Sequence, residues 1–176
     1  MKKVSWFFCA LFLSGNVWAV DAVSFELGNG NQTDVARVGA IWNWDKQWFT
    51  EGDWLVTGYW EATAGRWQGH SSTGNNQVIT DLGIAPVFRF QQKHPSGVAP
   101  YVEGAIGFHL ISPTYIYAGR NFSSAFQFGD HVGFGMRFGE HHRFDMSYRF
   151  QHVSNGDIKQ PNPGINFNQV HFAYYF

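Results

Sequence analysis

Apolar and polar residues alternate along most of this chain, which is the pattern of β-strands that have one apolar and one polar face. The final stretch shows the pattern clearly, because Val170, Phe172, Tyr174 and Phe176 occupy every second position. Segments of about ten residues with such alternation are typical of transmembrane β-barrels. The alternation predicts eight strands, at residues 22–29, 36–44, 54–64, 78–90, 100–110, 126–138, 143–152 and 168–176.

The two faces of these strands differ in charge. In the seventh segment, Met146, Tyr148 and Phe150 share one face, whereas Asp145 and Arg149 share the other. A charge on the lipid-facing side near the bilayer midplane costs about 2–4 kcal/mol, so a membrane enforces such segregation. We therefore expect apolar residues outside and paired charges inside a small lumen filled by side chains. The same segregation of mid-strand charges occurs in segments 54–64, 78–90, 100–110 and 126–138.

The N-terminal stretch has the composition of a secretory signal peptide. Lys2 and Lys3 precede an apolar run over residues 4–13, and the small residue Ala19 follows it. We predict cleavage after Ala19, with one barrel domain over residues 20–176. The only cysteine, Cys9, lies inside the leader after bulky residues, so we expect no lipidation, no disulfide and no thiol chemistry.

The composition supports an exported membrane barrel. Aromatic residues make up 19% of the chain and charged residues only 14%, against about 25% charged residues in soluble domains. No apolar run of about 18 residues follows the leader, which excludes a helical span, and 12 basic against 13 acidic residues give no footprint for nucleic acid. We predict an all-β, eight-stranded antiparallel transmembrane β-barrel of the bacterial outer membrane. A soluble β-sandwich or lipocalin-like barrel is disfavoured, because it would not direct aromatic residues outward on most strands.

Three further expectations concern the C-terminus, Pro86 and the connections between the predicted strands. The terminal aromatic residues up to Phe176 resemble the signature of outer-membrane proteins, which implies recognition by the barrel-assembly machinery. Pro86 lacks the N–H group for a ladder hydrogen bond, so we expect a bulge or local distortion there. Periplasmic turns are expected at residues 45–53, 91–99 and 139–142, and outward loops at residues 30–35, 65–77, 111–125 and 153–167.

Polar residues of types that are common in catalytic sites lie at the end of the seventh predicted strand and beyond it. His152 continues the outward parity of Phe150, Ser154 follows on the same face, and Asn166 and Asn168 have outward parity on the neighbouring eighth strand. A serine nucleophile needs a base such as histidine, a group that orients the base, and donors for the oxyanion. Because polar groups on a lipid-facing surface are costly, this set indicates a catalytic site. The alternative is a polar loop in which asparagine, glycine and proline supply turns.

Segment 152–166, with its Gln160-Pro161-Asn162 and Gly164-Ile165 elements, resembles the signature of the outer-membrane lipid A 3-O-deacylase (PagL) family. The length, leader, barrel pattern and aromatic C-terminus agree with it. The resemblance implies a serine esterase that hydrolyses the ester-linked 3-hydroxyacyl chain at the 3-position of lipid A, the membrane anchor of lipopolysaccharide, with its active site facing the outer leaflet. It implies that Ser154 is the nucleophile and His152 the general base. It also implies that Asn155 and Asn162 shape the site or donate to the oxyanion.

One site position departs from the family pattern. A member of the family carries a glutamate where this chain has Asn166. An amide can orient His152 and fix its tautomer, but it cannot stabilise an imidazolium with a full charge, and loss of that charge in a triad costs orders of magnitude in rate. Three readings stay open: Asn166 is a weaker orienting residue, another acid such as Asp157 assists, or the enzyme is slow or inactive. We favour the first.

Two other function classes fit a small outer-membrane barrel. One is a non-enzymatic barrel, and the other is a different barrel enzyme that modifies acyl chains of lipid A or of phospholipids. Adjacent His141 and His142 fit a solvated turn better than a metal site, so we expect neither metal nor cofactor. The expected partners are lipid A and the outer membrane, and a homodimer is left open.

Overall fold

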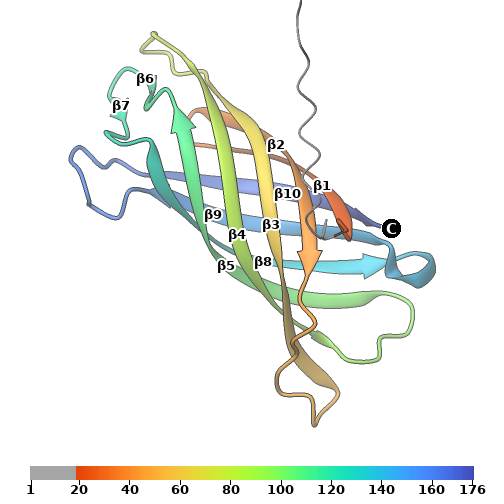
Figure 1. Cartoon of the computed structure of the whole chain (residues 1–176). Helices are drawn as coiled ribbons and strands as arrows, with labels where there is room; N and C mark the ends of the chain where they lie inside the picture. Colours follow the sequence, from red (N-terminus) through yellow and green to blue (C-terminus); the bar gives the residue numbers. More distant parts are fainter. Residues whose placement is uncertain (1–18) are drawn as a thin grey trace, which may run out of the picture.

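The structure is a computed structural model that describes residues 19–176 (Figure 1). The predicted leader, up to residue 18, lies outside the described residues. Eight strands form one closed antiparallel barrel, which confirms the predicted fold class, and a short hairpin forms a separate two-stranded sheet. In residues 19–176 no helix is long and apolar enough to cross a membrane. The barrel strands are β1 (Ala22–Gly30), β2 (Thr33–Asn43), β3 (Trp54–Gly69), β4 (Val78–Gln92), β5 (Ala99–Ser112), β8 (Phe126–Phe138), β9 (Phe144–Ser154) and β10 (Ile165–Tyr175); the hairpin is β6 (Tyr115–Tyr117) with β7 (Arg120–Asn121), and a 3₁₀ turn spans Glu140–His142.

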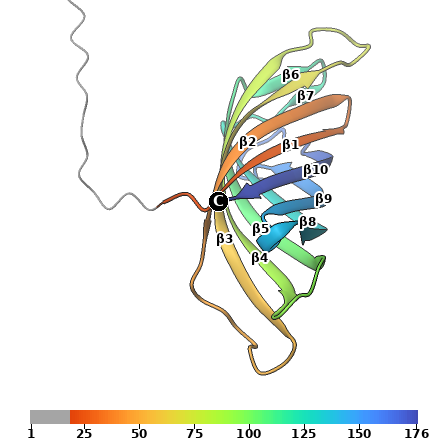
Figure 2. The same ribbon diagram turned by 90° about the vertical axis from the view of Figure 1, so that its right-hand side faces the viewer.

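Around the barrel the strands follow the order β1-β10-β9-β8-β5-β4-β3-β2 (Figures 1 and 2). The first and last strands pair with each other, from Ala22 opposite Tyr175 to Asn29 opposite Asn168, and this pairing closes the sheet. We call the barrel end that carries residues 31–32, 70–77, 113–125 and 155–164 the loop end, and the other the terminus end. The hairpin β6–β7 lies at the loop end (Figure 1).

The eight strands lie where the alternation predicts them, and the largest differences fall at the loop end. Strand β3 continues past residue 64 to Gly69, where it pairs with Thr33 of β2. Strand β10 begins at Ile165, before the predicted start at Asn168. Glycines and polar residues at these ends hid the strand pattern, but the ladder partners extend the strands. The hairpin β6–β7 was not predicted, because its three-residue and two-residue strands are too short to show alternation.

Charged side chains fill the lumen, as the parity of the strands predicts. Arg149 Nε lies 2.8 Å from Glu103 Oε1 and its Nη1 lies 2.9 Å from Glu61 Oε2, while Arg89 Nη1 lies 2.7 Å from Asp145 Oδ2. All of these side chains are buried. The opposite charges compensate one another in the small lumen, where a lone charge would carry a large desolvation penalty.

Replacement of Arg149 by methionine is expected to destabilise the barrel by about 3–5 kcal/mol, because buried carboxylates then lose their compensating charge. Arg149 also lies 3.3 Å from Glu26, so the change affects three acids at once. Urea unfolding in detergent, followed by tryptophan fluorescence, would measure the loss. Arg143→Met, at an exposed position, serves as the control. An equal midpoint for Arg149→Met and wild type would contradict this role of the ion pairs.

An apolar cluster closes the barrel at the loop end. Trp67 lies 5.8 Å from Phe122 and 5.2 Å from Phe167 between ring centroids, and all three side chains are fully buried. The cluster combines strand residues with the hairpin segment, so the hairpin forms a cover over the lumen. Its members are Val35, Trp67, Ile79, Ile111, Ile116, Tyr117, Phe122, Val153, Ile165 and Phe167.

The outward faces of the strands, which we call the outer wall, carry exposed apolar residues such as Val132 and Phe134. Two local features refine the sequence prediction. At Pro86 the pairing of β4 with β5 is interrupted without a shift of register, so the distortion is confirmed but there is no bulge. The expectation that mid-strand charges lie on the inner face is wrong at Asp130, which is exposed on the outer wall of β8.

Candidate active site on the outer wall

His152 lies near the loop end of β9, with its side chain exposed on the outer wall. The alternation of β9 decides this orientation, because Val153 and Gln151 on either side of it are buried. Its Cα partners across the sheet are Asp130 on β8 and Asn166 on β10. A titratable ring therefore lies between a carboxylate and an amide on an otherwise apolar surface.

Asn166 orients the imidazole of His152. Its Oδ1 lies 2.6 Å from Nδ1 of His152. Because an amide oxygen only accepts, Nδ1 carries the proton in this contact and the lone pair is left on Nε2. The backbone N–H of Asn166 donates to Oδ1 of Asn31 over 2.9 Å, which fixes the start of β10. The ring thus has the tautomer that a general base requires.

Ser154 is the last residue of β9 and lies on the same face as His152, two positions further along the strand. Its Cα partner on β8 is Phe128. Among residues 19–176 its hydroxyl has no hydrogen-bond partner, which leaves the oxygen free to meet a substrate. In empty active sites the nucleophile and the base are often further apart than in the complex with substrate.

Asn155 and Asn162 shape the chain that follows Ser154. Asn155 is fully buried, and its Nδ2 donates to the carbonyl oxygens of Lys159 and Phe122 over 2.7 and 3.1 Å. The backbone N–H of Asn155 donates to Oδ1 of Asn162 over 3.0 Å. That N–H group is therefore engaged within the loop, and both asparagines hold the loop in its conformation.

Asp157 does not lie beside His152. Its Oδ1 accepts from Nε2 of Gln160 over 3.0 Å and from Nδ2 of Asn162 over 3.1 Å. The carboxylate is thus part of the loop network and orients Asn162. The structure brings His152, Ser154 and Asn166 together, but it does not bring Asp157 to this group.

The hairpin segment that covers the lumen also contacts the loop of residues 155–164. Arg120 donates from Nη1 to the carbonyl oxygen of Gly164, and Oγ of Ser123 donates to the carbonyl oxygen of Pro161 over 2.8 Å. The guanidinium of Arg120 also lies 5.7 Å from the ring centre of Tyr117. Residues far apart in the sequence therefore fix the C-terminal part of segment 155–164.

Gly164 leaves room for the ring of His152. A Cβ atom at this position would lie 2.9 Å from Cε1 of His152, and the residue has φ of +55°. Side chains strain a backbone in this left-handed region. We expect Gly164→Ala to displace the ring and to lower activity about 100-fold, since a shift of about 1 Å in a catalytic group has effects of this size.

Activity on purified substrate, measured beside barrel stability, would test this expectation for Gly164. Gly74→Ala provides the control, since that glycine also has positive φ but has open space around it. Full activity of a folded Gly164→Ala variant would show that the ring does not need this space.

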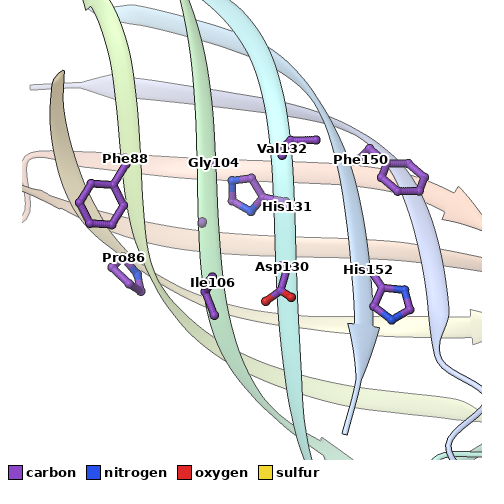
Figure 3. Close-up of a pocket in the computed structure, with 10 residues that line it drawn as sticks. Pro86, Phe88, Gly104, Ile106, Asp130, His131, Val132, Phe150 and His152 are labelled. Atoms are coloured by element: carbon purple, nitrogen blue, oxygen red, sulfur yellow. The ribbon is translucent and has the colours of Figure 1, made fainter. Parts of the chain in front are cut away.

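Asp130 is the site residue that the sequence reading missed. It is the Cα partner of His152, yet in the described part of the chain its carboxylate has no hydrogen-bond or ion-pair partner. Figure 3 shows Asp130 between Ile106 and His152, with the imidazole directed away from it. The sequence does indicate that Asp130 points outward, because position 130 shares the face of Val132 and Phe134 on the same strand.

A hollow in the outer wall extends from His152 and Asp130 over β8, β5 and β4 (Figure 3). Its volume is about 530 Å³, within the range of about 300–1,000 Å³ that small-molecule sites have. The lining is almost entirely apolar apart from the histidines and Asp130. It comprises Pro86, Phe88, Gly104, Ala105, Ile106, Asp130, His131, Val132, Phe150 and His152.

The donor set at this site offers no metal-binding cluster. In residues 19–176, no group of three or more histidine, cysteine, aspartate or glutamate side chains is arranged to hold a metal ion. His142, one of the two adjacent histidines, places its Nε2 2.7 Å from the carbonyl oxygen of Gly97 at the terminus end. The site on the outer wall itself offers imidazole, hydroxyl, carboxylate and amide groups, from His152, Ser154, Asp130 and Asn166.

Comparison with known proteins agrees with the geometry. Residues 34–175 match the family described as lipid A 3-O-deacylase (PagL). The lipid A deacylase PagL of Pseudomonas aeruginosa is 33% identical over 144 residues, which cover 81% of this chain and 79% of that protein. That of Bordetella bronchiseptica is 34% identical over 122 residues, covering 69% and 60%. The crystal structure of the outer membrane enzyme PagL superposes with a TM-score of 0.76 at 29% identity, covering 88% of this chain and 99% of that one.

Proposed function

Because this chain belongs to the lipid A 3-O-deacylase (PagL) family, it is an outer-membrane hydrolase of lipid A, and we propose that His152 and Ser154 perform the reaction as a serine esterase. The observation that carries the proposal is the contact between Asn166 Oδ1 and His152 Nδ1, at 2.6 Å. It leaves the basic Nε2 free on the face that also presents Ser154. A base, a hydroxyl and an orienting group are the parts that hydroxyl nucleophiles need.

The reaction follows from these groups. Oγ of Ser154 attacks the ester carbonyl carbon while its proton passes to Nε2 of His152. The tetrahedral intermediate then collapses, the bond to the sugar oxygen breaks, and the imidazolium returns the proton to that oxygen. A water molecule, deprotonated by His152, hydrolyses the acyl-serine, which releases the fatty acid and restores the Ser154 hydroxyl.

The position of the site suits a lipid substrate. A site on the outer wall meets its substrate by lateral diffusion in the membrane, and the apolar residues around it contact acyl chains. We propose that the loop end faces outward, so that His152 and Ser154 lie in the outer leaflet close to the headgroups, where water is available. Recognition of Phe176 by the barrel-assembly machinery and formation of a homodimer stay predictions.

Asn166 occupies the orienting position in this proposal. It fixes the tautomer of His152 as a carboxylate would, but it leaves the imidazolium with less stabilisation. Asn155 and Asn162 act by shaping the loop, because the N–H of Asn155 donates to Asn162. The proposal therefore describes a working esterase whose base lacks a carboxylate on its orienting side.

Mass spectrometry of purified lipid A after incubation with the purified barrel tests this function. Loss of one ester-linked acyl chain from the 3-position is the expected result. A gain of acyl mass would instead indicate an acyltransferase, and release of fatty acid from glycerophospholipids alone would indicate a phospholipase. Unaltered lipid A with a folded barrel would favour the non-enzymatic alternative.

A further inference from the structure

We propose that a groove over β2 and β3, on the side of the barrel opposite to His152, binds a lipid A molecule without cleaving it, with a phosphate group of the lipid at Arg66. In one direction β10 and β1 separate β2 from β9, and in the other β8, β5 and β4 separate β3 from β9. The two strands are coloured orange to yellow in Figure 1. The inference uses the proposed outward orientation of the loop end, but it does not depend on the serine mechanism.

Small residues form the floor of this groove. Ala40 and Ala62 are Cα partners on β2 and β3, and Val38 and Ala64 form the next pair but one on the same face, toward the loop end. Val38 and Ala64 are exposed, and the other two are half-buried. The four residues line a hollow of about 650 Å³, which lies within the range of about 300–1,000 Å³ that ligand sites have.

Bulky residues border the floor on both sides. Phe25 on β1 is the Cα partner of Val38, Leu82 on β4 is the Cα partner of Ala64, and both side chains are exposed. The outside of a barrel is convex, so a second barrel would rest on these rims, whereas a single acyl chain reaches the floor between them. We therefore assign the groove to a lipid chain rather than to a second copy of this protein.

Polar side chains lie at the loop end of the groove. Arg66 is exposed on the outer wall, three residues before the end of β3, and it lines a further hollow of about 440 Å³ together with Asp34 and Gln68. Within residues 19–176 its guanidinium has no hydrogen-bond or ion-pair partner. Its Cα partner on β4 is Thr80, whose exposed hydroxyl is also unpaired in this part of the chain. Two adjacent donors are thus available to a ligand.

An uncompensated guanidinium beside a hydroxyl group fits a phosphate. Arginine binds phosphate through two parallel hydrogen bonds, and the hydroxyl of Thr80 adds a third donor. A cation on the lipid-facing side of a barrel costs little only close to the interface, which is also the depth of lipid phosphates. Asp34 lies one pair further toward the loop end, with Oδ2 at 3.6 Å from Nδ1 of His70, and offers acceptor oxygens to sugar hydroxyls. Lipid A combines phosphate, sugar hydroxyls and acyl chains in one molecule.

The length of the groove suits one leaflet of the membrane. Arg66 and Ala62 are four residues apart on β3, which is about 14 Å at about 3.4 Å per residue. Because barrel strands are tilted by about 35–45°, this length spans a depth of about 10 Å, close to half of an apolar band of about 25 Å. The next outward pair toward the terminus end is Trp42 with Trp60, whose indole rings end the row of small residues. An acyl chain with its phosphate at Arg66 would therefore end near the midplane.

Native mass spectrometry of the purified barrel with lipid A tests the site, because it counts the bound lipids. The barrel carries Ser154→Ala so that the substrate stays intact. Arg66→Leu in this background should bind one lipid A fewer, with Kd for that site raised about 10–100-fold, which is the effect of losing hydrogen bonds between charged groups. Arg66→Lys keeps the charge and should retain the lipid. Lipid A without its phosphates should show the same loss on a barrel that keeps Arg66.

Ala64→Phe tests the floor of the groove. The side chain points outward from the barrel, so the variant is expected to fold, and the added ring fills the hollow. It should lose the same lipid as Arg66→Leu. Val98→Phe adds an aromatic ring at an exposed position of the terminus end and should keep the full number of lipids. Far-UV circular dichroism would verify the fold of each variant.

The outcomes separate this site from the esterase. An unchanged number of bound lipids in Arg66→Leu and Ala64→Phe would overturn the site, and equal binding of phosphate-free lipid A would overturn the role of Arg66. A mass of two barrels that disappears in Ala64→Phe would assign the groove to a second copy instead. The mass of each bound lipid reports on the esterase independently: deacylated lipid A on the Ser154→Ala barrel would exclude the serine mechanism and leave the number of bound lipids unaffected.

Discussion

Alanine in place of Ser154 is expected to abolish deacylation of lipid A, with kcat reduced by a factor of about 10⁴ or more. The hydroxyl is the only nucleophile that the outward face of β9 places next to His152. Without it, water has to attack the ester directly, and the acyl-enzyme pathway is lost. The remaining groups can still bind the substrate, so the loss should appear in kcat rather than in KM.

Mass spectrometry of lipid A from cells that express each variant measures this result, and purified barrels give the rates. Ser72→Ala is the matched control, since it removes an exposed hydroxyl from another segment of the loop end. His152→Ala should show a loss of similar size, because a nucleophile and its base act as one unit. A Ser154→Ala barrel that still removes the acyl chain would exclude the serine mechanism and leave the family assignment untouched.

Glutamate in place of Asn166 should raise kcat about 10–1,000-fold, the largest gain we expect from any single change in this chain. The position already contacts Nδ1 of His152 through Oδ1 at 2.6 Å, so a carboxylate there replaces a neutral acceptor by a charged one. A negative charge stabilises the imidazolium that forms as Ser154 attacks. Asn166→Leu should have the opposite effect and lower kcat about 100-fold, because the tautomer of the ring is no longer fixed.

Asn168→Glu is the control for this series, since it adds the same acid on the same face of β10, two residues away. In the native chain, Oδ1 of Asn168 accepts a hydrogen bond from the hydroxyl of Tyr148 and does not contact His152. Equal activities of wild type, Asn166→Glu and Asn166→Leu would show that this position does not orient the base. A gain for both glutamate variants would point to a general effect of charge near the site.

The strands and their faces followed from the sequence because they depend on local rules. A side chain on a strand points outward or inward by a period of two, and a membrane requires apolar residues outside. These two rules predicted the lumen position of Arg149 and the outward position of His152. They also placed Ser154 beside His152, since residues two apart on one strand share a face.

The partners of these residues across the sheet were not predictable in the same way. Register is a property of two strands together, and it depends on turn lengths and on how the charged lumen packs. The sequence indicated that position 130 points outward, yet only the pairing of β8 with β9 puts Asp130 next to His152. The hollow at Gly104 likewise depends on which residues flank it on β4 and β8.

The sequence by itself therefore determined the kind of fold, the outward orientation of His152 and Ser154, and the proposal that this histidine and this serine carry the chemistry. Only the tertiary structure decided that Asp157 belongs to the loop, that the hairpin β6–β7 supports that loop through Arg120, and that Asp130 faces an apolar depression. The physical reason is the range of the forces. Alternation is enforced residue by residue by the membrane, whereas contacts between strands far apart in the sequence form only when the whole barrel closes.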